Sequence, residues 1–269
     1  MARKKKKGRS LLWLLVKLPF IGVGKVIAIS FKALNKQVEK GFEKRKLRKA
    51  PAYSILPKFE SFNIEKEISG EFHYTEKRIF SDSLILLIFG KRGSGKSSLG
   101  FRLLENIHSK TKRKCYALGI EQKLIPNWIS SVDSVEKVPN GGVVLIDEGA
   151  ISFGSRDSMT IKNKELIKLL AIARHKSLSL VFVTQNTGLI DKNILALTDA
   201  LFVKEGSLLQ MEMERPEVRK FYEKANKSLK EIKENRKGHV YLIDSDFEGT
   251  LSYKLPSFWS NDLSKNKAV

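Results

Sequence analysis

The sequence predicts an α/β fold, a doubly wound and mostly parallel sheet, from two observations. Short apolar runs rich in Val, Ile, Leu and Phe alternate with helix-forming stretches, and a glycine-rich loop follows the first of these runs. Apolar runs without polar alternation are typical of strands buried on both faces of a parallel sheet. The strand–helix alternation then places helices on both sides of that sheet.

Five apolar runs are the predicted core strands. They span residues 84–89, 115–120, 143–147, 178–184 and 200–204. The helix-forming stretches between them include SSLGFRLLENIHS and KNKELIKLLAIARH. Together these segments account for the predicted central sheet and the helices that cover it.

A helix and a hairpin are expected after the last core strand. The helix has Pro216 as its first-turn signal and Gly238 as its stop signal. Residues 239–256 predict a β-hairpin about Asp246–Gly249. The apolar residues of the helix share one face and predict packing on the domain: Val218, Phe221, Tyr222, Ala225, Leu229 and Ile232.

Positive charge is concentrated near the start of the chain. The formal net charge is +21, and residues 1–50 hold 16 Lys or Arg against Glu39 and Glu43, which is +14. Such a tail is typical of attraction to phosphate groups, either lipid headgroups or nucleic acid. A solubilising arm is the alternative.

The same tail contains an apolar segment, residues 11–31. Its 21 residues reach the length that spans a bilayer, but Lys17, Pro19 and Lys25 interrupt it. We expect a helix or re-entrant segment at the inner face of a membrane, with residues 1–31 as the attachment. Spanning the bilayer and packing on protein remain open. The single cysteine, Cys115, fits a cytoplasmic location.

Composition along the chain predicts four regions. Residues 1–50 are the basic, apolar tail, and residues 51–67, which contain Pro51 and Pro57, are expected to be a linker. The nucleotide-binding domain is predicted over residues 68–257. Residues 258–269 are expected to form a C-terminal tail.

The glycine-rich loop carries the clearest motif. Residues Gly90-Lys91-Arg92-Gly93-Ser94-Gly95-Lys96-Ser97 fit the pattern G-x-x-x-x-G-K-[ST], and Ser98 completes the loop. A predicted strand precedes the motif and a predicted helix follows it. In this context the backbone N–H groups and the helix N-terminus cradle phosphates. Lys96 is expected to reach the β- and γ-phosphates, and Ser97 to bind Mg²⁺. The motif therefore predicts a P-loop NTPase.

A second motif, VVLIDEGA, ends in adjacent carboxylates some 50 residues after the loop. Asp147 is expected to hold Mg²⁺ through its water shell, and Glu148 to activate the attacking water. The sequence lacks the Asn-Lys-x-Asp element of guanine-binding switches. ATP is therefore the expected nucleotide.

A third stretch carries a family resemblance. A predicted helix ends in Ala173-Arg174-His175, and the next predicted strand ends in Thr184-Gln185. Roughly residues 80–205 thereby resemble the FtsK/HerA superfamily of P-loop motor ATPases. Within that superfamily, the chain is similar to small viral packaging ATPases and to zona occludens toxin-like assembly ATPases.

The resemblance implies roles that the spacing alone does not. Gln185 is then the polar sensor of the γ-phosphate or its attacking water, and Arg174 an arginine finger given to the neighbouring subunit. Arg156 is the alternative finger, and Arg174 could instead be a cation at a helix C-terminus. A finger supplied in trans implies a ring, expected to be a hexamer.

Two functions follow from the resemblance. One is a ring motor that translocates or packages viral or plasmid DNA, in which case the chain is expected to be virus-encoded. The other is a membrane-anchored assembly or extrusion ATPase that acts on protein subunits.

Overall fold

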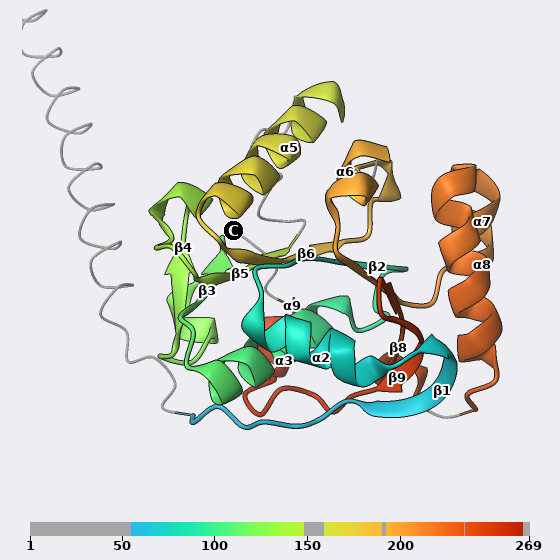
Figure 1. Cartoon of the computed structure of the whole chain (residues 1–269), viewed down its shortest axis with the longest axis horizontal. Coiled ribbons are helices and arrows are strands. Elements are labelled where there is room, and N and C mark those ends of the chain that lie inside the picture. The colour runs from blue at the N-terminus through green and yellow to red at the C-terminus, as the bar shows by residue number, and fades with distance from the viewer. Residues whose placement is uncertain (1–54, 148–158, 190–191, 234, 266–269) are drawn as a thin grey trace, which may run out of the picture. The chain divides into compact units, whose positions relative to one another are not determined.

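The computed structural model describes residues 55–147, 159–189, 192–233 and 235–265. The chain divides into two compact units, and these residues all belong to the second, Pro51–Val269. Its centre is one nine-stranded sheet of order β1-β9-β8-β7-β2-β6-β5-β3-β4 (Figure 1). The strands are β1 (Asn63–Gly70), β2 (Ile85–Phe89), β3 (Cys115–Leu118), β4 (Ile129–Val132), β5 (Val143–Asp147), β6 (Ser179–Thr184), β7 (Ala200–Val203), β8 (His239–Asp244) and β9 (Phe247–Ser252).

The parallel part of the sheet contains all five predicted core strands. From β7 through β2, β6, β5 and β3 to β4, every pairing is parallel. The β2 strand is buried along its whole length. Its uninterrupted apolar sequence follows from this, because layers on both sides of the sheet exclude water from it.

Helices cover both faces of the sheet, as a doubly wound fold requires. Alternate residues of β2 enter two separate cores: Leu86 and Ile88 join one, and Leu87 and Phe89 the other. Helices α2 and α3 pack on the first core, and α5 and α8 on the second (Figure 1). The α-helices are α2 (Phe72–Ser81), α3 (Lys96–Thr111), α5 (Met159–His175), α6 (Lys192–Leu197), α7 (Leu208–Met213), α8 (Pro216–Lys230) and α9 (Asn261–Lys265). The predicted α/β fold class is confirmed.

The predicted helix and hairpin after the core strands are both present. Helix α8 has Pro216 in its first turn and buries Val218, Tyr222 and Leu229 on the face that meets the sheet. The hairpin turn is at residues 245–246, earlier than predicted, and Gly249 lies inside β9. Asp244 explains this position, since its Oδ1 accepts the backbone N–H groups of residues 246 and 247, at 2.9 and 2.8 Å.

The folded domain extends beyond residues 68–257 at both ends. Residues 63–67, expected in a linker, belong to β1, which pairs antiparallel with β9. All eight residues of β1 are exposed, so no apolar run marks the strand in the sequence. Beyond the other boundary, Phe258 and Leu263 are buried against the core. Terminal segments thus complete the domain rather than only flank it.

Within the described residues, no helix combines the length and apolar character needed to cross a membrane. The basic tail, residues 1–50, and the apolar segment 11–31 inside it lie outside the described residues. The expected membrane attachment therefore stays a prediction.

Candidate nucleotide-binding site

The phosphate loop connects β2 to α3 at the carboxyl edge of the sheet. It leaves β2 after Phe89, and α3 begins at Lys96. Gly95 has φ 91°, a left-handed conformation that favours glycine, and a Cβ there would lie 2.7 Å from the carbonyl oxygen of Lys237. Lys96 folds back over the loop, and its Nζ donates to the carbonyl of Lys91 at 2.9 Å. The predicted strand–loop–helix context of the motif is present.

Strand order brings the other predicted site residues to this loop. The β6 strand lies between β2 and β5, with Thr184 paired to Phe89 and Val183 to Asp147. Neighbouring strands are about 4.8 Å apart. Gln185, which follows β6 directly, therefore emerges between the phosphate loop and Asp147. Three segments that lie far apart in sequence thus end side by side.

Ser97 and Asp147 are in direct contact. The Ser97 hydroxyl donates to Asp147 Oδ2 at 2.7 Å, across the interval between α3 and β5. Hydroxyl and carboxylate oxygens are the ligands that Mg²⁺ prefers, and it is usually bound by one or two protein groups together with substrate phosphates. The pair therefore fits the predicted metal, with Ser97 and Asp147 as the residues that would hold it.

The loop itself fits a phosphate chain. The Ser94 hydroxyl is buried and, among the described residues, has no hydrogen-bond partner. A Cβ added at Gly93 would meet no atom within 4 Å, so the loop faces open space there. Buried polar atoms without a partner are rare in proteins, which points to a ligand at this loop.

Two predicted site residues, Glu148 and Arg156, lie outside the described residues. Arg174 is described and lies elsewhere: it stands near the end of α5, just before β6 begins. That is the edge of the sheet opposite the phosphate loop. Arg174 is exposed, and its Nη2 donates to the carbonyl of Leu197 at 3.2 Å. Within one subunit it does not join Ser97, Asp147 and Gln185.

A buried lysine beneath the loop was not predicted. Lys204 follows β7 and is 1% exposed; its Nζ donates to the carbonyls of Lys237, at 2.8 Å, and His239, and to Tyr253 Oη at 3.1 Å. Burial, and secondarily the charge of Lys96, lowers the pKa of Lys204 to about 7. A lysine that ends an apolar run resembles an ordinary strand end, so the sequence carries no signal for this role.

Lys204 and Tyr253 support the phosphate loop from below. A Cβ at Gly90 would lie 2.6 Å from Lys204 Cβ, so the first glycine of the motif packs directly on this side chain. Tyr253 Oη lies 2.9 Å from the Gly95 carbonyl, to which it donates. Burial raises the pKa of this phenol, which keeps it protonated as a donor. The C-terminal hairpin thus helps to shape the loop.

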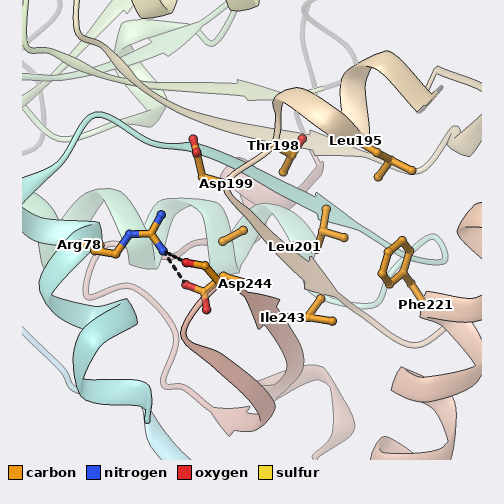
Figure 2. A pocket seen from close by; sticks show the side chains of 10 residues that line it. Arg78, Leu195, Thr198, Asp199, Leu201, Phe221, Ile243 and Asp244 are labelled. Atoms are coloured by element: carbon orange, nitrogen blue, oxygen red, sulfur yellow. Dashed lines mark hydrogen bonds and ion pairs between the residues drawn. The ribbon is translucent and has the colours of Figure 1, made fainter. Parts of the chain in front are cut away.

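A cavity of about 410 Å³ lies at the edge of the sheet opposite the phosphate loop; Figure 2 shows the side chains that line it. Arg78 stands on its wall, already paired with Asp244 and Asp246 at 3.5 and 2.7 Å. Asp199 is also engaged, since its carboxylate accepts the backbone N–H of Ile85 at 2.7 Å. The cavity is remote from the phosphate loop and its charged groups are satisfied, so it is not part of the nucleotide site.

Residues 99–207 match the family model described as "Zonular occludens toxin (Zot)", a range that begins just after the phosphate loop. No curated protein matches the chain.

Several solved structures are similar in fold at low identity. The DNA-packaging ATPase B204 of Sulfolobus turreted icosahedral virus is 15% identical, with 65% of this chain and 98% of that chain covered and a TM-score of 0.41. The pCW3 conjugation coupling protein TcpA is 10% identical, with 67% and 62% covered and a TM-score of 0.42. The cytoplasmic domain of the type VII secretion ATPase EccC of Thermomonospora curvata is 14% identical, with 63% of this chain and 23% of that chain covered and a TM-score of 0.39.

The family match includes α5, which ends at His175, and β6, which ends just before Gln185. The resemblance was based on these two segments. The sheet places the phosphate loop, Asp147 and Gln185 at one edge. The predicted resemblance to the zona occludens toxin-like family is confirmed over residues 99–207.

Proposed function

We propose that this domain binds ATP with Mg²⁺ and hydrolyses it as a subunit of a ring motor that moves DNA. One observation carries the proposal: the 2.7 Å contact between Ser97 and Asp147, beside the phosphate loop and the end of β6. It joins a phosphate cradle, a pair of metal-binding oxygens and a polar side chain within one small region.

The residues divide the work of hydrolysis. Lys96 and the loop N–H groups hold the phosphates, while Ser97 and Asp147 would hold Mg²⁺. When held there, the ion would supply positive charge to neutralise the phosphate oxygens. Glu148, next to Asp147 in sequence, accepts a proton from the attacking water, and Gln185 orients that water. Positioning and electrostatics of this kind account for most of the catalysis of phosphoryl transfer.

Substitution of Lys96 and Glu148 tests the hydrolytic site. Lys96→Ala should abolish ATP binding, whereas Glu148→Gln should keep binding and lose turnover, because Glu148 acts only on the water. Equilibrium binding of ATP and single-turnover hydrolysis measure the two steps separately. Lys77→Ala, at an exposed position on α2, is the matched control and should behave as the unsubstituted protein. Full turnover in Glu148→Gln would exclude it as the base.

Arg174 is proposed to complete the site of a neighbouring subunit. Its place at the edge opposite the phosphate loop is compatible with a role between subunits and not with one in its own site. Arg174→Ala should bind ATP normally and hydrolyse it about 10³–10⁵-fold more slowly. Mixing this variant with Glu148→Gln should restore part of the activity, since mixed rings contain some intact composite sites. Assembled mixtures with no recovery would assign Arg174 a structural role instead.

Charge supports DNA as the cargo. The chain carries +21, of which +14 belongs to residues 1–50, and cationic side chains attract the phosphate backbone of DNA without reading bases. In the full-length protein, duplex DNA should raise the ATPase rate several-fold, and the effect should weaken steeply as salt increases. Lys96→Ala is the control for contaminating ATPases.

The second candidate is an assembly ATPase attached to the inner face of a membrane. The apolar segment 11–31 and the zona occludens toxin match favour it. The same ATPase assay, repeated with anionic vesicles in place of DNA, separates the two functions. Retention on vesicles at high salt, together with indifference of the ATPase rate to DNA, would select the assembly function and reject the DNA motor.

A further inference from the structure

A cleft of about 350 Å³ adjoins the phosphate loop and is not used by the proposed phosphate and metal contacts. One wall is formed by Lys91, Gly93 and Ser94 of the loop, and the opposite wall by residues 235–237, which connect α8 to β8. Glu205, after β7, closes the cleft between them. Its volume falls within the range of about 300–1,000 Å³ that is usual for small-molecule sites.

An unsatisfied atom on the cleft wall points to a ligand. Ser94 is only 5% exposed, and its hydroxyl has no hydrogen-bond partner among the described residues. A buried hydroxyl without a partner is unfavourable, so such groups are normally satisfied. Because Ser94 belongs to the phosphate loop and also lines the cleft, a nucleotide that occupies both would supply that partner.

The charge of the cleft indicates what kind of ligand group it accepts. Lys91 Nζ lies 2.7 Å from Glu205, and Arg236 Nη1 lies 3.4 Å from the same carboxylate. Both pairs are partly exposed, and the two cations share the single carboxylate of Glu205. The pairing holds the planar guanidinium of Arg236 at the cleft, and its Nε also donates to the carbonyl of Ile232 at 3.0 Å. A fixed guanidinium plane is suited to stack on an aromatic ring.

The two walls are held together beneath the cleft. The carbonyl of Lys237 accepts from Lys204 Nζ at 2.8 Å and lies 3.0 Å from Tyr253 Oη. Tyr253 also reaches the loop through the carbonyl of Gly95. On the wall itself, the carbonyl of Asn235 accepts the backbone N–H of Gly238 at 2.8 Å. The separation of the walls is therefore set before any ligand arrives.

We propose that this cleft binds the nucleoside part of the nucleotide, with the base stacked on Arg236 and the Glu205 carboxylate accepting a hydrogen bond from the base or ribose. The inference rests on the proposed function, since it requires phosphates in the adjoining loop. It adds two specificity-determining residues, Glu205 and Arg236, that lie outside the sequence motifs.

Two probes that differ only in the nucleoside test the proposal: a non-hydrolysable ATP analogue and inorganic tripolyphosphate. Binding of each to the full-length protein is measured by calorimetry. Arg236→Ala should lower the affinity for the ATP analogue about three- to thirtyfold, which is the range of cation–π contacts. The affinity for tripolyphosphate should change by less than about twofold. Arg236→Lys keeps the charge but loses the stacking plane, and should recover only part of the affinity lost in Arg236→Ala. Lys233→Ala, an exposed cation of the same connection that does not line the cleft, is the matched control.

The outcomes separate this inference from the proposed function. Unsubstituted protein that binds neither probe would overturn both. Two outcomes would overturn the nucleoside cleft alone. One is binding of the ATP analogue that depends on Lys96 but does not change in Arg236→Ala. The other is an equal loss of affinity for both probes in Arg236→Ala. Circular dichroism of each variant confirms that it is folded, so a loss of binding reports on the cleft.

Discussion

Two buried cations, Arg102 on α3 and Lys204 after β7, are held in different ways. Arg102 is 1% exposed and forms an ion pair with the buried carboxylate of Glu105 at 2.9 Å. Lys204 is equally buried, but its hydrogen-bond partners in the described residues are backbone carbonyls and the Tyr253 phenol. Among the described residues, Arg102 forms an ion pair with a carboxylate, whereas Lys204 is held by uncharged oxygen atoms.

The Arg102 region joins the two ends of the domain. Its guanidinium donates to the carbonyls of Lys58 and Lys254, at 3.0 and 2.9 Å, and to that of Leu255. Glu105 accepts the backbone N–H groups of Lys58 and Ser257, both at 3.0 Å. Burial lowers the pKa of Arg102, but arginine stays charged in proteins and Glu105 opposes the shift. This cluster is a permanent structural connection.

The Lys204 region instead supports a site where charge arrives with a ligand. Its pKa of about 7 means that the lysine gains or loses a proton near neutral pH. Phosphates placed near Lys96 and Lys204 would favour the charged form. The difference shows that a buried cation with a carboxylate serves stability, whereas one without a carboxylate can respond to the nucleotide.

The largest effect on stability is expected at Arg102. Arg102→Met leaves Glu105 buried without its cation and should lower the free energy of unfolding by about 3–5 kcal/mol. Urea unfolding measures the change. The double variant Arg102→Met/Glu105→Gln should recover part of it, because no buried charge remains. A loss below 1 kcal/mol in the single variant would contradict the connection of the chain ends by this pair.

Lys204→Met is expected to act chiefly on the nucleotide. Methionine keeps the length of the side chain, but the Lys237 carbonyl and Tyr253 lose their shared donor. Disorder in one loop residue costs about 1–2 kcal/mol, so the affinity for an ATP analogue should fall about tenfold. Arg102→Met, assayed under conditions where it is folded, should bind normally. An equal loss of affinity for the ATP analogue in Lys204→Met and Arg102→Met would show that the two cations do not differ in this respect.

The pH dependence of stability sharpens the same distinction. The pKa of Lys204 is about 7 when folded against 10.5 ordinarily, so between these values the unfolded chain binds more protons. The contribution of Lys204 to stability therefore rises with pH, by about 1 kcal/mol from pH 7.5 to 8.5, and is constant well below pH 7. Urea unfolding of the unsubstituted protein minus that of Lys204→Met isolates it. If the free energies of unfolding of the two proteins changed with pH in parallel, Lys204 would have to stay charged over the whole range.

Tyr253→Phe should have the smallest effect. It removes the donor to the Gly95 carbonyl and keeps the buried ring, so the free energy of unfolding should fall by about 0.5–1.5 kcal/mol. Affinity for an ATP analogue should fall less than in Lys204→Met, since Lys204 keeps its other partners. A loss larger than in Lys204→Met would make the tyrosine, not the lysine, the main support of the loop.

Prediction from the sequence succeeded where the signal is local and failed where pairing is remote. The five core strands are visible because each is a continuous apolar run buried on both faces. The β1 strand is exposed along its length and pairs with β9, nearly 190 residues later, so neither composition nor neighbours reveal it. The short β4 strand was not predicted either, because the exposed Ser130 and Ser131 interrupt its apolar character.

The sequence by itself determined the chemistry of the phosphate loop and the alternation of strands and helices, because glycine spacing and apolar runs act over a few residues. Only the tertiary structure decided which chain ends meet. In the sheet, β6 lies between β2 and β5, so that Gln185 emerges beside the phosphate loop, whereas Arg174 lies at the opposite edge. The tertiary structure also placed Lys204 and Tyr253 under the glycines of the loop. Strand order and long-range packing depend on the burial of the whole sheet, which no short stretch of sequence contains.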